Sequence, residues 1–136
     1  GVSNYGAAHL EAMKTYATYM PAVNQVEFNP WLQRPQLKKA TEAIGAKVMA
    51  YSPLARGHKV DDPELGAIAE RLDATPAQVA IKFCYDEGCI TIPKSSNPSR
   101  IIENLASLSV DISSEMDAIR ALECDYISGW DPTTEP

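Results

Sequence analysis

Residues 23–53 read VNQVEFNPWLQRPQLKKATEAIGAKVMAYSP, and their pattern determines the class of fold. The segment begins with an apolar-rich extended run, VNQVEF, and ends with a second one, KVMAY. Between them, Leu37, Ala40 and Ile44 recur at helical spacing, and Gly45 is a typical helix C-terminal stop. Two strands joined through a helix pair in parallel by a right-handed crossover. Residues 23–53 therefore predict an α/β fold.

The same alternation continues on both sides of this segment. Residues 1–4 have the pattern of a strand end, and residues 10–20 are expected to form the helix that follows it. Downstream, an aspartate or threonine followed by proline predicts helix starts, because such residues cap a helix whose first position accepts proline. The run CITIP predicts the last strand, and the tail YISGWDPTTEP is expected to be irregular. The expected helix starts are Asp61 or Asp62, Thr75, Asn97 or Pro98, and the segment after Asp111.

The expected element order is β-α-β-α-β-α-α-β-α-α, which fits two architectures. One is an open doubly wound sheet, and the other is part of a (β/α)₈ barrel. No G-x-G-x-x-G follows any expected strand, so the dinucleotide-binding form of the first architecture lacks its usual signature. A complete barrel typically needs about 250 residues, whereas this chain has 136.

Composition excludes several classes of function. The formal net charge is −6, which is the wrong sign for a general nucleic-acid surface, although a local basic pocket remains possible. No apolar run is long enough to span a bilayer. The three cysteines and two histidines lack the spacing of metal ligands, so we expect no metal site and free thiols in a reducing compartment such as the cytoplasm. The chain starts without methionine, and we expect a segment upstream of Gly1.

Several motifs occur together in this order: GVSNY, VNQVEFNPWLQ, AYSPLARG, TPAQVAIKFC and IPKSSNPSRIIEN, followed by a helix with Glu115-Met116. In order and spacing, the chain resembles the aldo-keto reductases from Gly1 to about Pro132. The resemblance implies that residues 1–136 are a single partial domain, the C-terminal half of a (β/α)₈ TIM barrel with the last four of its eight strands. It also implies an NADPH-dependent oxidoreductase that reduces aldehydes and ketones to alcohols, with the cofactor across the C-terminal mouth of the barrel.

The resemblance assigns the nicotinamide end of the cofactor to four residues. Ser3 and Asn4, at a strand end, and Gln25, inside the next strand, are expected to bind the carboxamide. The side-chain amides of Asn4 and Gln25 both donate and accept hydrogen bonds, which suits a carboxamide. Tyr51 is expected to stack on the nicotinamide ring and to select the face that is offered for hydride transfer. The alternative reading is that Asn4 only caps a turn and that Gln25 is a satisfied buried amide.

The segment after Tyr51 is expected to lie over the pyrophosphate. Ser52 and Leu54 carry this assignment through the resemblance, and Arg56 is a weaker member because loop arginines are usually solvated. The stretch ITIPKSSNPSRIIEN, residues 90–104, supplies the other end of the cofactor.

Lys94 and Ser95 follow the last strand, and Arg100 lies on the first turn of the next helix. A helix N-terminus favours anions, and a lysine with an arginine fork adds specificity for a phosphate dianion. In the resembling family, this arrangement holds the adenosine 2′-phosphate, which predicts NADPH over NADH. Glu103 and Asn104 are expected to contact the adenine. The alternative is a solvated surface turn.

No catalytic residue is assigned to this chain. In the family, a tyrosine, a lysine, an aspartate and a histidine from the earlier strands supply the proton, and those motifs are absent from this sequence. Tyr51 belongs to the stacking motif and is not the acid. These 136 residues alone are therefore expected to lack reductase activity. Trp130, in the tail, is the expected substrate contact, and Trp31 is as well explained by packing.

Two further readings stay open. The first is a non-catalytic nucleotide-binding protein of the same fold that regulates a partner, as channel β-subunits resembling this family do. The second is a stand-alone half-barrel that dimerises as a binding module. We expect a small carbonyl substrate, no nucleic-acid or membrane partner, a monomeric parent, and self-association of the half-barrel through exposed sheet edges.

Overall fold

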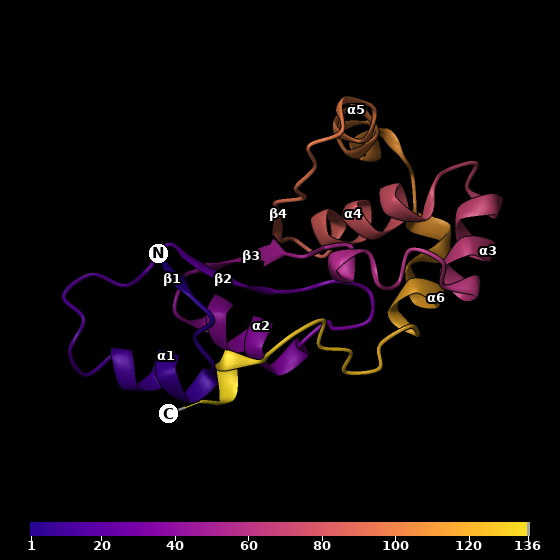
Figure 1. Cartoon of the computed structure of the whole chain (residues 1–136). Helices are drawn as coiled ribbons and strands as arrows, with labels where there is room; N and C mark the ends of the chain where they lie inside the picture. The colour runs from indigo at the N-terminus through magenta and orange to yellow at the C-terminus, as the bar shows by residue number, and fades with distance from the viewer. Residues whose placement is uncertain (136) are drawn as a thin grey trace.

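The computed structural model describes residues 1–135. A single sheet of four parallel strands forms its centre, in the order β1-β2-β3-β4 (Figure 1). Its strands are β1 (Val2–Ser3), β2 (Val23–Glu27), β3 (Lys47–Tyr51) and β4 (Ile90–Thr91). Its helices are α1 (Ala7–Met13), α2 (Pro35–Ala43), α3 (Pro63–Arg71), α4 (Pro76–Asp86), α5 (Pro98–Ala106) and α6 (Met116–Arg120). The predicted order of strands and helices is confirmed.

The two faces of the sheet differ in burial. Val26, Val48 and Ala50 point to the helices and are buried, as alternation along a strand requires. On the opposite face, Gln25 and Met49 are only half-buried, and the Gln25 Nε2 lies 3.3 Å from the Met49 sulfur. This second face has no helices of its own, and it corresponds to the interior of a barrel. The arrangement is that of a half-barrel.

The hydrophobic core lies between the sheet and the helices. Phe28, just after β2, stacks on Phe83 of α4 with ring centroids 6.3 Å apart. Trp31 is buried in the same core, and its indole N–H donates a hydrogen bond to Asp62 at 3.1 Å. Trp31 is thus a packing residue.

Local capping chemistry sets where three of the helices begin. Asp62 accepts hydrogen bonds from two backbone N–H groups at the start of α3, and Asn97 does the same for α5. Thr75 forms a reciprocal capping box with Gln78 at the start of α4. Each cap precedes a proline, as the sequence predicts. At the other end of α4, Gly88 has a φ of 82°, a left-handed conformation that glycine adopts without strain.

The first helix is shorter than predicted. The sequence predicts a helix over residues 10–20, but α1 ends at Met13 and a turn follows. Only Leu10 and Met13 of α1 are buried, and Tyr19 is 89% exposed, so a longer helix would gain no packing. Threonines and tyrosines after Met13 have modest helix propensity, and the Thr15 hydroxyl bonds back to the Ala12 carbonyl at 2.8 Å.

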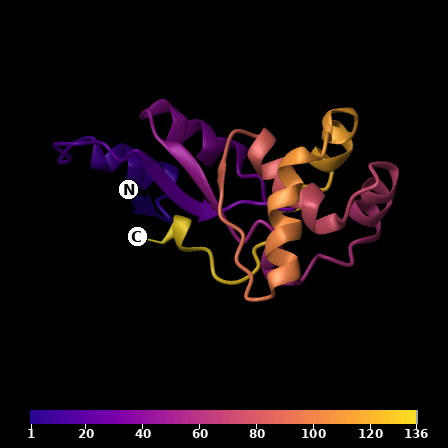
Figure 2. The same ribbon diagram turned by 90° about the horizontal axis from the view of Figure 1, so that it is seen from above.

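Helix α5 stands above the other helices in Figure 1, and seen from above in Figure 2 it lies in front of them. None of its residues is buried. The apolar side chains of Ile101, Ile102 and Leu105 on this helix are exposed. The connection to α5 leaves from β4, which has a partner strand on one side only.

Within residues 1–135, no helix has both the length and the apolar character needed to cross a membrane.

Candidate functional site

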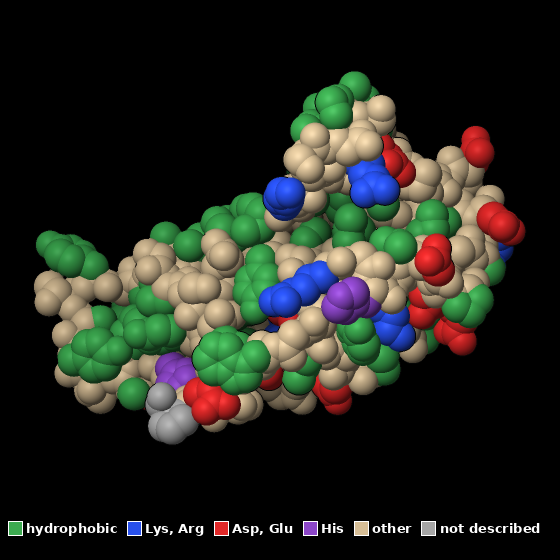
Figure 3. All heavy atoms as spheres, viewed as in Figure 1, with side chains coloured by type: hydrophobic (Ala, Val, Ile, Leu, Met, Phe, Trp, Pro, Cys, Tyr) green, Lys and Arg blue, Asp and Glu red, His purple; other side chains and the backbone are tan. Residues whose placement is uncertain are grey.

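A cavity of about 870 Å³ lies where the C-terminal ends of β3 and β4 face α5. Four separate segments line it, namely the end of β3 with the loop after it, the start of α4, the turn after β4, and the first half of α5. The space-filling view shows basic side chains around the hollow below α5 (Figure 3). The sequence-predicted residues that line the cavity are Tyr51, Ser52, Leu54, Lys94, Ser95, Arg100, Glu103 and Asn104.

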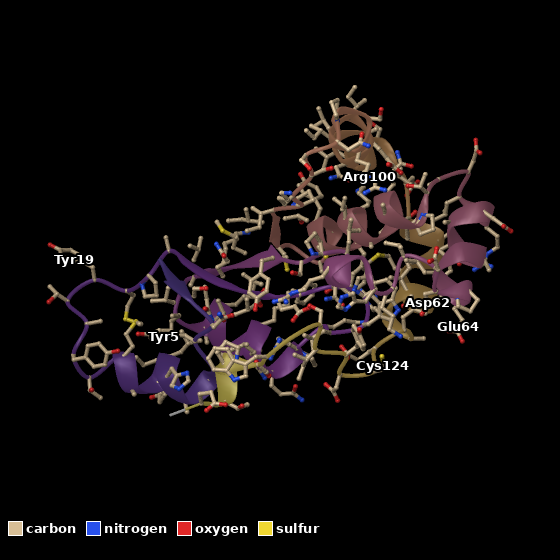
Figure 4. The ribbon with its side chains drawn as sticks, viewed as in Figure 1. Tyr5, Tyr19, Asp62, Glu64, Arg100 and Cys124 are labelled. Atoms are coloured by element: carbon tan, nitrogen blue, oxygen red, sulfur yellow. The ribbon has the colours of Figure 1, made fainter. Side chains whose placement is uncertain are left out.

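The basic end of the cavity holds charges that no acidic side chain neutralises. Among the described residues, neither Lys94 nor Arg100 takes part in an ion pair. Arg100 lies on the side of α5 that faces the rest of the chain (Figure 4). Asn97 caps the first N–H groups of α5 with bonds of 2.9 and 3.4 Å. An anion at this end would therefore be bound mainly by the side chains of Lys94 and Arg100. An anion of more than one charge fits this end.

An acidic side chain with a polar partner also lines the cavity. The Thr75 hydroxyl donates a 2.6 Å hydrogen bond to the Glu103 carboxylate. The bond spans from the N-terminus of α4 to α5, and both residues line the cavity. Sequence reasoning recognised Thr75 only as a helix cap. Its position next to Glu103 depends on a contact between distant segments, which the capping pattern does not contain.

Tyr51 ends β3 on the open face of the sheet and lines the cavity. Burial, helped by the nearby Glu27 carboxylate, raises the pKa of its phenol above the ordinary value of 10.0. The ring is therefore neutral at physiological pH, and it offers an apolar face for stacking together with a phenolic hydroxyl.

The loop after Tyr51 has an unusual backbone. Ser52, Ala55 and Arg56 all have φ between 46° and 56°, in the left-handed region that costs energy for residues other than glycine. Such conformations cluster at functional sites because surrounding contacts must hold them in place. Ser52 and Arg56 both line the cavity. Ala55 is completely buried, so the loop is anchored in the core.

Three of the four residues predicted for the nicotinamide, Ser3, Asn4 and Gln25, lie outside this cavity. The Asn4 N–H and the Ser3 hydroxyl both donate to the Gln25 carbonyl, at 2.8 and 3.1 Å. Ser3 and Asn4 line a separate cavity of about 460 Å³. Ser3, at the end of β1, pairs with Gln25 in the middle of β2, and Gln25 pairs with Met49 of β3. The three residues therefore lie next to one another, but they do not share one cavity with Tyr51.

Asn4 carries a feature that suits a ligand. Its φ is 58°, and its side-chain Oδ1 is buried without a hydrogen-bond partner among the described residues. A buried acceptor without a donor is unfavourable by about 1–3 kcal/mol. A carboxamide N–H₂ group would supply the missing donor, so the nicotinamide end fits the residues present.

Trp130 does not line any of these cavities. Its side chain is 69% exposed, and its indole N–H donates to Glu135 at 3.3 Å. The predicted contact of Trp130 with a substrate therefore stays a prediction.

Within residues 1–135, no group of three or more histidine, cysteine or acidic side chains has the geometry to hold a metal ion.

Comparisons with known proteins agree with the fold. The sequence model of the Aldo/keto reductase family matches residues 1–123. Among characterised relatives, Aldose reductase B of Dictyostelium discoideum is 42% identical over 125 residues, 90% of this chain and 40% of that protein. Glyoxal reductase of Bacillus subtilis is 40% identical over 133 residues, 97% of this chain and 48% of that protein.

Solved structures with known folds also resemble this chain. A Gox0644 mutant in complex with NADPH superposes with a TM-score of 0.90 and 37% identity, covering 100% of this chain and 51% of that one. Gox0644 in its apo form gives a TM-score of 0.90 at 36% identity. The chain thus spans about half the length of the proteins it matches. Because the family match extends over nearly all of its residues, this chain belongs to the aldo/keto reductase family.

Proposed function

We propose that these residues are the cofactor-binding half of an NADPH-dependent reductase of aldehydes and ketones. In this proposal, residues 1–136 are one partial domain, and the strands that relatives have in addition complete the barrel. The support comes from the family match and from the NADPH complex of Gox0644, a protein that has the same fold over the whole of this chain.

The observation that carries the proposal is the composition of the 870 Å³ cavity. An aromatic ring, a loop with left-handed backbone, three cations without an ion pair among the described residues, and an acidic side chain all line it. A dinucleotide with a phosphate on its adenosine ribose has groups that complement each of these. A surface turn that is only solvated would not need such an arrangement.

Each residue then has a defined part in holding the cofactor. Lys94, Ser95 and Arg100 would bind the 2′-phosphate, because a point charge, a hydroxyl and a guanidinium fork complement its oxygens. Glu103 and Asn104 would face the adenine, and Ser52 and Leu54 the pyrophosphate. Tyr51, Ser3, Asn4 and Gln25 would orient the nicotinamide. When bound, the cofactor supplies the hydride that reduces the carbonyl carbon.

Reduction of a carbonyl also requires a proton for the alkoxide. Tyr51 is the one tyrosine that lines the 870 Å³ cavity, and its raised pKa and its position at the stacking surface make it a poor donor. We therefore expect the 136-residue chain to bind NADPH without reducing an aldehyde. The substrate class is then a property of the complete protein. Its free thiols are consistent with a cytoplasmic location.

A thermal melt tests the proposal. The chain is heated alone, with saturating NADPH, and with saturating NADH, and the midpoint temperature is compared. A ligand that binds only the folded state raises the midpoint, by an amount that grows with its affinity. We expect a clearly larger shift with NADPH than with NADH. Equal shifts, or none with either nucleotide in a chain that melts cooperatively, would contradict the proposed 2′-phosphate site.

A further inference from the structure

Two glycines with ordinary backbone angles make close contacts at the C-terminal tail, residues 127–135: Gly6, on which the tail packs, and Gly129, which belongs to the tail. The segment runs back from α6 across the molecule to α1 (Figure 1). A Cβ on Gly6 would lie 1.9 Å from the Thr133 carbonyl oxygen. A Cβ on Gly129 would lie 3.0 Å from three atoms of the Arg56 guanidinium. Neither glycine has a left-handed φ, so close packing explains them both: Gly6 leaves room for the tail, and Gly129 leaves room for Arg56.

Arg34 attaches the tail to the end of β2. Its guanidinium forms a two-bond pair with the Asp131 carboxylate, at 3.1 and 3.0 Å. It also donates to the Thr133 hydroxyl at 3.0 Å and to the Glu27 carbonyl at 3.1 Å. The Arg34 and Asp131 side chains are only 11% and 16% exposed. A partly buried fork of this kind gives geometric specificity as well as energy.

Further contacts hold the tail on both sides of Arg34. The buried Glu27 carboxylate accepts from the Ser128 N–H, at 3.3 Å to each oxygen. At the far end, His9 lies 2.6 Å from the Glu135 carbonyl. The other ring nitrogen of His9 accepts from the Gly6 N–H at 2.9 Å, which makes the nitrogen next to Glu135 the donor. The tail is therefore fixed on both sides of Gly129.

Arg56 connects this tail to the cofactor cavity. It belongs to the short 3₁₀ helix η1 (Ala55–Gly57), has a φ of 56°, and lines the cavity. Among the described residues, its guanidinium has no acidic partner. It rests instead against the backbone at Gly129. The position of the tail thus limits where the guanidinium can lie.

We propose that Arg34 is a positioning residue for the cofactor: it holds the tail so that Gly129 supports Arg56 and the left-handed loop over residues 52–57. The tail then sets the affinity for the anionic part of the dinucleotide, although it lines none of that cavity. The effect on affinity rests on the proposed function, whereas the coupling between tail and loop does not.

Amide hydrogen exchange of the natural protein at its full length tests the coupling. The variant Arg34→Gln removes the fork, and Lys39→Gln, at an exposed position on α2, is the control. We expect Arg34→Gln to raise exchange several-fold over residues 128–134 and over residues 52–57, and the control to change neither. Faster exchange over residues 128–134 with residues 52–57 unchanged would overturn the proposal.

Graded substitutions at Gly129 provide a second test that does not depend on Arg34. Alanine requires the flexible Arg56 guanidinium to move by a few tenths of an ångström, and valine requires a larger displacement. We expect NADPH affinity to fall slightly with Gly129→Ala and about tenfold with Gly129→Val. Gly66→Ala is the matched control, because a Cβ on Gly66 meets no atom within 4 Å.

The route through Arg56 is tested by a double-variant cycle. In an Arg56→Ala background, Gly129→Val should no longer lower NADPH affinity. If it lowers affinity by the same factor in both backgrounds, the contact with Arg56 is not the cause and the proposal is wrong. Failure of the unsubstituted protein to bind NADPH would instead contradict the proposed function, while the exchange measurement would still decide the coupling.

Discussion

The Thr75 hydroxyl donates a 2.6 Å hydrogen bond to the Glu103 carboxylate and so joins the start of α4 to α5. The same hydroxyl accepts from the Gln78 N–H at 3.2 Å, and the Gln78 side chain accepts from the Thr75 N–H at 3.0 Å. Because α5 buries none of its residues, it depends on such polar contacts for its position. Thr75 therefore serves both as a helix cap and as a support for the wall of the cofactor cavity.

Replacing Thr75 should affect both roles. Loss of a helix cap costs about 1 kcal/mol, and the Glu103 carboxylate loses its donor as well, so we expect Thr75→Ala to reduce the free energy of unfolding by about 1–2 kcal/mol. Thr75→Ser keeps the hydroxyl and should recover most of this. Urea denaturation measures the change. A serine variant as unstable as the alanine variant would show that the methyl group, and not the hydroxyl, is what matters.

The lowered pKa of Glu87 predicts how the stability of the protein depends on pH. Burial favours a higher pKa for its carboxyl, but hydrogen bonds from Arg120, at 2.9 Å, and Lys38, at 3.1 Å, outweigh it and hold the pKa below the ordinary value of 4.5. A depressed folded-state pKa stabilises the protein above the unfolded-state pKa, and this contribution is lost as pH falls through the folded-state value.

The variant Glu87→Gln tests this sign. At about pH 7 we expect it to lower the free energy of unfolding by roughly 1–2 kcal/mol, since it removes a half-buried charge between two cations. Below about pH 4, the difference from the unsubstituted protein should shrink. Urea denaturation across this range measures both. A difference that stays constant with pH would exclude a role for the Glu87 charge.

The three cysteines should differ strongly in reactivity. Burial raises the pKa of Cys89 to about 12, and burial also raises the pKa of Cys84 well above its ordinary value. Cys124 is exposed. Because the thiolate is the reactive form, an aromatic disulfide reagent at about pH 8 should modify Cys124 quickly and the other two only after unfolding. Cys124→Ser should abolish the fast phase, and a fast phase that survives would contradict the burial of the other thiols.

The exposed apolar side of α5 predicts self-association of the isolated chain. Ile102 and Leu105 are both 71% exposed, and Leu105 also lines an apolar groove of about 1180 Å³ between α5, α4 and β4. Contiguous apolar patches mark interaction surfaces. Replacing Ile102 and Leu105 by glutamate should lower the apparent mass in sedimentation and change stability by less than about 0.5 kcal/mol. An unchanged mass, equal to that of a Lys39→Glu control, would place the contact elsewhere.

Much of the fold could be predicted because its signals are local. Asp62, Thr75 and Asn97 each cap a helix with a side chain next to the backbone that it binds, and the pattern that shows this is only a few residues long. The alternation of strands and helices likewise defines the parallel sheet. The end of α1 was not predicted, because the loss of packing after Met13, which no local pattern shows, adds to the modest helix propensity of the residues that follow.

The site could be predicted only in part, for a related reason. The motif after β3 and the motif after β4 supply residues that line one cavity, because parallel strands bring their ends together. Long-range contacts such as Arg34 with Asp131 leave no local pattern, since each residue alone has the appearance of a surface charge. The separation of Asn4 from the main cavity also depends on how the chain packs beyond its own strand.

The most direct test of the account compares the affinities for NADPH and NADH by calorimetric titration, in the unsubstituted protein and in the double variant Lys94→Ala, Arg100→Ala. We expect a preference for NADPH of at least about tenfold, or about 1.4 kcal/mol, in the unsubstituted protein. In the double variant the NADPH affinity should fall to that of NADH, while the NADH affinity stays the same. Loss of both affinities by equal factors, or no preference at the outset, would contradict the assignment of the basic end of the cavity to a 2′-phosphate.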